Sequence, residues 1–149
     1  MQIQQINSTD PEKVYVAVKN VSASSLTTGY AVALAIAGNS FDGVNAVLAD
    51  SDDTGNLPGF IGVARADIAS NSNGQVISAG FAASVFLSHV GSSITINQGD
   101  PLVPGKAPGG LASLAPTYAA SGFRYVLASN TPPAVSAAAY CSGLVRCAL

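Results

Sequence analysis

The chain has 149 residues, enough for a single domain whose core needs neither disulfides nor metals to hold it together. Hydrophobic residues make up 48% of the sequence, which excludes an intrinsically disordered chain. Charged residues make up only 9%, against about a quarter in an average soluble domain, and the formal net charge is −2. Nucleic-acid binding is not expected, because phosphate recognition needs clustered cations and the six here are scattered singly: Lys13, Lys19, Arg65, Lys106, Arg124 and Arg146.

A surface this poor in charge has little electrostatic repulsion to keep copies of the protein apart. Two interpretations follow, a neutral monomer or a protein whose surface is largely covered in an assembly, and the composition favours the assembly. No membrane association is expected, because the longest apolar run, residues 30–37, falls far short of the roughly 20 residues that span a bilayer. The first residues lack the basic and apolar segments of a signal peptide.

Residues 1–12 are polar and close on Asp10-Pro11, which predicts a flexible N-terminal arm ahead of a single domain over residues 13–149. Apolar residues at every second position predict a half-buried strand over residues 14–18. A second strand is expected over residues 30–36 and a short third strand over residues 44–48.

Short strands also dominate the middle of the chain. Residues 60–64 form a brief apolar segment that predicts a strand. Asn73-Gly74 predicts a hairpin turn before a strand at residues 75–77, because both residues tolerate positive φ. Gly80 is expected to separate that strand from another at residues 82–87, and residues 98–101 form a predicted turn before a strand at 102–103.

The last third of the chain is richer in proline and alanine. Residues 104–116 predict a loop with a short helical turn at 111–114, and residues 134–139 could form a brief helix. Closing strands are expected at residues 123–127 and 144–149. Strands this short, with turns every 8 to 12 residues, are typical of a small all-β barrel or sandwich.

The residues that could carry chemistry do not form a constellation. His89 is the only histidine, so any Ser-His-Asp relay would have to use it, but its place at the end of an apolar strand favours a structural role. The acidic loop at residues 50–55 begins like a calcium-binding loop, but Ile61 stands where the closing bidentate glutamate should be. Residues 99–106 differ from a phosphate-binding loop in spacing, and Ala107 replaces the magnesium-binding hydroxyl.

Cys141 and Cys147 could face each other across a tight hairpin around Ser142-Gly143, which would permit a disulfide, although two reduced and partly buried thiols are favoured. Two cysteines and one distant histidine are too few for a zinc site. We therefore predict no catalytic, cofactor-binding or metal-binding residues, and no enzymatic activity.

A pattern of glycines and β-forming hydrophobic residues over about residues 13–128 resembles the small capsid decoration, or cement, proteins of tailed bacteriophages. The segments that carry the resemblance are 13–16 (KVYV), 26–29 (LTTG), 59–64 (GFIGVA), 74–76 (GQV), 80–81 (GF), 96–102 (INQGDPL) and 123–127 (FRYVL). The proline-rich loop and the C-terminal cysteine segment have no counterpart in that pattern.

The resemblance implies a barrel or β-tulip fold that forms trimers or other homo-oligomers on the capsid surface of the virion, after synthesis in the host cytoplasm. Its implied partner is the major capsid protein, and its implied role is to stabilise the shell without catalysis. Loops at residues 50–55 and 104–116 are expected contact surfaces. The arm is expected to contact the capsid or a neighbouring copy through Met1, Gln2, Ile3, Gln4, Gln5, Ile6 and Asn7.

Three alternatives stay open at this point. The first is another virion component, such as a head-fibre base, a tail or baseplate adaptor, or a minor capsid protein. The second is a hydrolytic enzyme that uses His89. The third is a secreted or cell-surface β-module with an oxidised Cys141–Cys147 pair.

Overall fold

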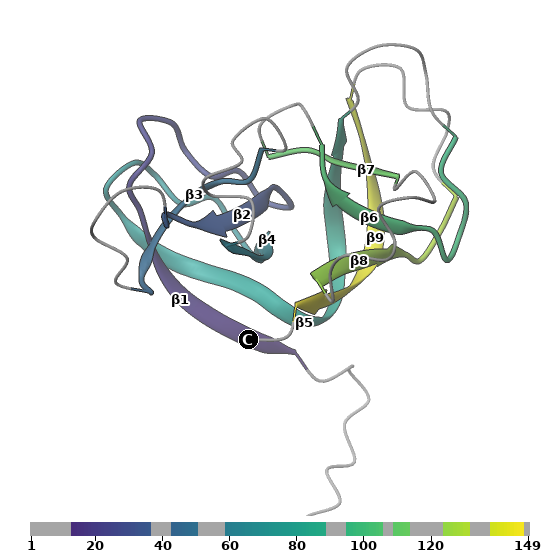
Figure 1. The fold of residues 1–149 in the computed structure, drawn as a ribbon, viewed down its shortest axis with the longest axis horizontal. Coiled ribbons are helices and arrows are strands. Elements are labelled where there is room, and N and C mark those ends of the chain that lie inside the picture. The colour runs from purple at the N-terminus through teal and green to yellow at the C-terminus, as the bar shows by residue number, and fades with distance from the viewer. Residues whose placement is uncertain are drawn as a thin grey trace, which may run out of the picture.

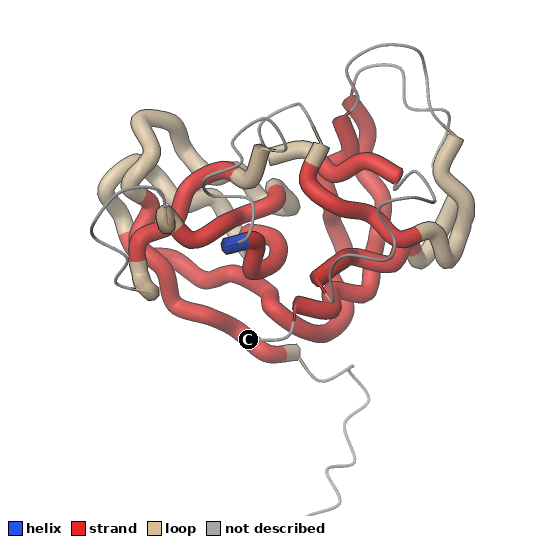
Figure 2. The backbone as a smooth tube through the Cα atoms, in the orientation of Figure 1, coloured by secondary structure: helices blue, strands red, loops and turns tan. Residues whose placement is uncertain are grey.

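The computed structural model describes residues 13–36, 43–50, 59–88, 95–105, 109–113, 124–131 and 138–147. Strands joined by loops make up most of this part of the chain, with one short helical segment, as Figure 2 shows, which confirms the predicted all-β class. The strands are β1 (Val14–Asn20), β2 (Ala31–Leu34), β3 (Asn45–Leu48), β4 (Phe60–Ala64), β5 (Asn73–Ser88), β6 (Pro101–Pro104), β7 (Leu111–Ser113), β8 (Arg124–Ala128) and β9 (Ala138–Cys147).

The strands form one sheet that closes on itself twice. The order β1-β3-β2-β4-β5 closes into a five-stranded barrel because β1 also pairs with β5. The order β5-β7-β6-β8-β9 closes in the same way because β9 also pairs with β5. Two five-membered rings therefore share β5, and Figure 1 shows this teal strand running from one ring into the other.

The shared strand divides its pairing between the rings. Its first part pairs antiparallel with β1 and β4, and its second part pairs antiparallel with β9. The second ring is completed by a single parallel pair between Leu87 of β5 and Leu111 of β7. Ala79 lies at the junction, because it pairs with Val14 of β1 and with Arg146 of β9.

Each ring has its own apolar cluster. The first-ring cluster contains Val18, Leu26, Val32, Ala46, Ile61, Ala64, Ile68 and Val76. The second cluster fills the other ring and also covers the neighbouring wall of the first, and it contains Ala31, Ala33, Ala49, Phe60, Val63, Ile77, Ala82, Val85, Leu87, Ile96, Leu102, Leu111, Val126, Ala128, Cys141, Val145 and Cys147. Strands of the shared wall therefore bury both faces, and all five residues of β4 are buried.

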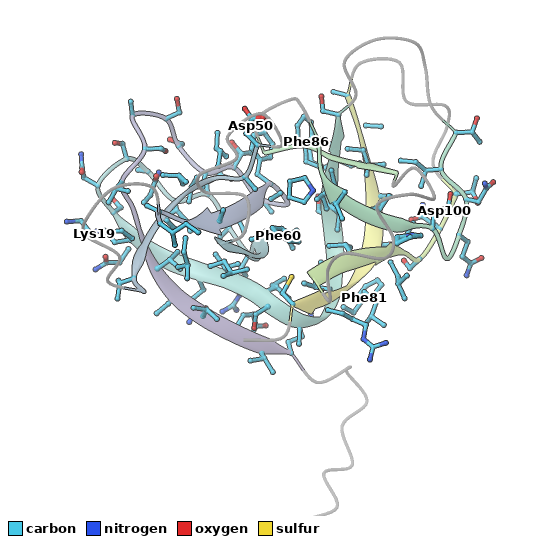
Figure 3. The ribbon with its side chains drawn as sticks, viewed as in Figure 1. Lys19, Asp50, Phe60, Phe81, Phe86 and Asp100 are labelled. Carbon is cyan, nitrogen blue, oxygen red and sulfur yellow. The ribbon has the colours of Figure 1, made fainter. Side chains whose placement is uncertain are left out.

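A bulge in β4 sets which residues face which cluster. Gly62 has φ +140°, and the pairing with β2 shifts register beside it. As a result, Ile61 and Ala64 join the first-ring cluster, whereas Phe60 and Val63 join the second. In Figure 3, Phe60 lies in the middle of the molecule, between the rings.

The Asn73-Gly74 hairpin prediction is wrong. Both residues lie inside β5, opposite Lys19 and Val18 of β1, and the turn precedes them at Asn71, whose φ is +58°. Gly74 is needed for its size, because a Cβ there would lie 2.4 Å from side-chain atoms of Ile68.

Two other predictions from the sequence are also wrong. The strand β5 continues through Gly80, where φ is +104°, so Gly80 does not end it. The expected helical turn at residues 111–114 is replaced by β7, since Leu111 and Ala112 pair with β6. The two predicted closing strands are present as β8 and β9. However, β9 starts at Ala138, within the segment considered for a helix.

A buried asparagine holds the loop that follows β1. The Asn20 amide nitrogen donates to the carbonyl oxygens of Ser24 and Ile68, at 2.8 and 3.0 Å. Its side-chain oxygen accepts from the backbone N–H and the hydroxyl of Ser22. This network satisfies a fully buried amide, and its acceptor residue Ile68 pairs through its backbone with Leu26 of the first-ring cluster.

We expect Gly62→Ala to destabilise the fold by about 3 kcal/mol, because positive φ and overpacking add there. The new Cβ would lie 2.0 Å from the carbonyl oxygen of Ile77. Gly99→Ala is the matched control, since Gly99 also has positive φ but no atom within 4 Å of the added carbon, and it should cost about 1 kcal/mol. Urea denaturation measures both, and equal losses would contradict the packing role of Gly62.

Candidate interaction surface

Three aromatic side chains stack on one side of the molecule. The rings of Tyr30 and Phe86 lie 4.3 Å apart between centroids with an interplanar angle of 19°. Phe86 and Tyr140 lie 5.3 Å apart at 51°. Pairs in such offset or tilted geometry contribute about 0.5–1.5 kcal/mol each beyond burial. The stack joins the rings, because Tyr30 precedes β2 of the first ring and Tyr140 lies on β9 of the second.

Backbone pairing positions this stack. Phe86 of β5 and Tyr140 of β9 are direct cross-strand partners, and the Phe86 N–H donates to the carbonyl oxygen of Gly29 at 2.9 Å. Phe86 and Tyr140 thus form a pair without mutual hydrogen bonds, in which antiparallel side chains lie closest. Gly29 has φ +83°, and a Cβ there would lie 2.9 Å from the Ser84 carbonyl oxygen, so only glycine brings Tyr30 this close to β5.

The outer face of β9 carries two of the exposed large hydrophobic side chains of the described residues, Tyr140 and Leu144. We define the β9 outer face as Tyr140, Ser142, Leu144 and Arg146, which alternate with buried residues. Tyr140 is 52% exposed and Leu144 is 40% exposed. Tyrosine and arginine beside aliphatic surface are typical of protein–protein interfaces.

A carboxylate lies close enough to influence this face. The Asp67 side chain accepts hydrogen bonds from the Thr28 N–H and hydroxyl, at 2.7 and 2.8 Å, and these bonds lower the pKa of Asp67. Partial burial raises the pKa of Tyr140, and charge interactions with Tyr30 and Asp67 raise it further. The Tyr140 hydroxyl therefore stays protonated and can donate a hydrogen bond to a partner.

The first ring carries an exposed tyrosine of a different kind. The Arg65 guanidinium lies 4.8 Å from the centroid of the Tyr15 ring and donates to the side-chain oxygen of Gln75. A cation already covers one face of this ring, which leaves less of it for a partner. Tyr15 is therefore a suitable control residue for substitutions of Tyr140.

The other residues singled out in the sequence are not gathered into a site. The arm residues Met1–Asn7, His89, Lys106 and most of the acidic loop lie outside the described residues, and only Asp50 of that loop is described. Within the described ranges, no three or more His, Cys, Asp or Glu side chains lie close enough together to hold a metal ion. The same ranges contain no helix that is long and apolar enough to cross a membrane.

The stack itself was not predicted from the sequence. Its three residues are far apart along the chain, and their contact depends on the register between β5 and β9. The one local signal is Gly29-Tyr30, a glycine directly before an apolar strand.

The hairpin that would place the two cysteines opposite each other is absent, and the favoured prediction of two buried thiols without a disulfide is confirmed. Both are buried on the inner face of β9, six residues apart along one strand, and neither forms a disulfide. An extended strand separates such positions by about 20 Å, which excludes a disulfide between them. Burial raises the pKa of Cys141 to about 11.

This shift predicts a loss of stability in alkali. The folded-state pKa of Cys141 lies above the ordinary value of 9.0. The stability that the buried, protonated thiol contributes is therefore fully present below pH 9 and is lost as pH rises toward about 11. The loss at pH 10.5 should be about 1–2 kcal/mol, because solvent screening reduces the effect of the shift. Urea denaturation at pH 8 and pH 10.5 measures it, with Cys141→Ala as the variant that should lack this alkaline component. Identical pH profiles for the two proteins would contradict the assignment.

A comparison of the sequence with protein-family models and with curated proteins finds no match. The resemblance to capsid decoration proteins therefore rests on the pattern of glycines and hydrophobic residues alone. Apart from this resemblance, the structure itself shows a fold with one shared strand and an exposed β9 outer face.

Proposed function

We propose that this protein is a structural component of a phage virion that binds the outside of an icosahedral capsid, with the major capsid protein as its partner. The observation that carries the proposal is the β9 outer face, where Tyr140 is half exposed yet held in a stack. The sequence resemblance supplies the class of partner.

The geometry of Tyr140 suits an interface residue. Its ring is already fixed against Phe86, so little conformational entropy is lost when a partner covers it. Tyrosines in such preorganised positions are common among residues that dominate binding energy. Leu144, two residues along β9, extends the apolar area.

The composition fits repeated docking on a lattice. With 9% charged residues, few charges must be desolvated when copies pack against a shell. A homo-oligomer, with a trimer favoured by the resemblance, would present several β9 outer faces at once. Several modest contacts then give high occupancy through avidity.

We expect Tyr140→Ser to weaken binding to empty capsids strongly. Removal of an interface tyrosine that dominates binding costs about 2 kcal/mol, which is about 30-fold in affinity. Tyr15→Ser is the control and should bind like the unmodified protein. Co-sedimentation with purified empty heads measures both variants, and equal retention of the two would contradict the role of the β9 outer face.

Deletion of residues 1–12 should also weaken capsid binding while the isolated fold stays intact. The reason is that an arm can order on a partner and add backbone hydrogen bonds there. Circular dichroism checks the fold, and capsid occupancy checks binding. Undiminished occupancy by the truncated protein would contradict a role for the arm.

Electron microscopy of particles that carry the protein distinguishes a capsid decoration protein from another virion component. Density distributed over the shell is expected for a decoration protein. Density confined to the tail, the baseplate or a fibre base would instead favour the alternative virion role.

A further inference from the structure

We propose that the edge of β5 from Gly80 to Ala83 is a docking site for an extended segment, residues 1–7, of a second copy of this chain. The inference does not depend on the proposed function, because it concerns contact between copies and is tested without capsids.

The pairing defines two edges along β5. Ala79 pairs with Val14 of β1 and also with Arg146 of β9, so β1 and β9 lie on opposite edges. Leu87 pairs with Leu111 of β7 and also with Ala139 of β9, so β7 lies on the same edge as β1. On that edge, β1 ends its pairing at Ala79 and β7 begins at Leu87.

Part of the interval between β1 and β7 is already covered. The Phe86 N–H donates to Gly29, and Gly29 lies against the Ser84 backbone. Gly80, Phe81, Ala82 and Ala83 have no partner on this edge within the part of the chain that the structure describes. We call these four residues the open edge.

Phe81 is the residue of the open edge whose backbone groups can be shown to point outward. The Ser142 N–H and carbonyl bond to Asn130 and Ser129, away from β5. Because antiparallel strands alternate, Leu144 also turns its backbone groups away from β5. Its partner Phe81 therefore directs its own N–H and carbonyl toward the open edge.

The open edge is also accessible. Ala83 is exposed, and Gly80 and Phe81 are partly exposed. Figure 3 shows Phe81 near the lower rim of the second ring, away from Phe86. An unpaired strand edge of this kind can accept an extended peptide through main-chain hydrogen bonds.

The residues that precede β1 in the same chain are poorly suited to pair with the open edge. Continuing β1 backward would place residues 10–13 opposite the open edge, and Pro11 among them has no N–H to donate. A register shift between Val14 and Tyr15 already disturbs the pairing there.

Residues 1–7 of another copy meet the requirements. They contain neither proline nor glycine, so each can pair as a strand residue. Extended, they span about 23 Å, which exceeds the roughly 13 Å of a four-residue edge. Mutual exchange of such segments produces closed oligomers of identical chains.

The first test is the oligomeric state of the purified full-length chain by sedimentation velocity. We expect species at multiples of 14.8 kDa for the full-length chain, and only the mass of a single truncated chain when residues 2–7 are deleted. Phe81→Pro removes the outward N–H and should also give monomers, whereas Phe81→Val keeps that N–H and should stay oligomeric. A monomeric full-length chain, or a truncated chain that stays oligomeric, would overturn the proposal.

The second test decides the matter even if Phe81→Pro fails to fold. Chains carrying Gln4→Cys are mixed with chains carrying Ala83→Cys and oxidised, and the native cysteines are buried and do not compete. A covalent dimer that contains one chain of each kind is expected. A chain that carries both Gln4→Cys and Ala83→Cys tests pairing within one molecule. If that chain forms the bond internally and the mixed single variants give no dimer, exchange between copies is ruled out.

Discussion

The structure depends on one strand that serves as a wall of two rings at once. Because β5 pairs with β1 and β4 in its first part and with β9 and β7 in its second, its path must change direction between the rings. Gly80 and the register shift between Ala82 and Val85 provide that change. The walls that meet at the junction are buried on both faces, which explains why β4 is a continuous apolar run rather than an alternating one.

The aromatic stack follows from the same arrangement. Its members come from segments that only the shared strand brings together, and Phe86 on β5 lies between Tyr30 and Tyr140. A surface built this way holds its aromatic side chains against one another. Such a surface is suited to binding another protein, which is the role proposed here.

The sequence predicted the parts of the fold that depend on local pattern. Residues 60–64 were predicted as a strand with the bounds that β4 has, because a short apolar run between turn residues is a strong signal. Prediction from the sequence is wrong where a glycine does not mark a turn. Gly74 makes room for the Ile68 side chain, and Gly80 lets β5 bend. The stack and the separation of Cys141 from Cys147 depend on β5–β9 pairing, and no local pattern carries that information.

The shared strand also bears on how the protein comes apart. The second cluster contains residues of both rings, among them Phe60 and Val63 of the first. Unfolding of the second ring would therefore expose apolar residues of the first, so we expect the two rings to unfold as one cooperative unit. A fragment cut between them would leave each piece with an unpaired, largely apolar strand, the kind of surface that drives aggregation.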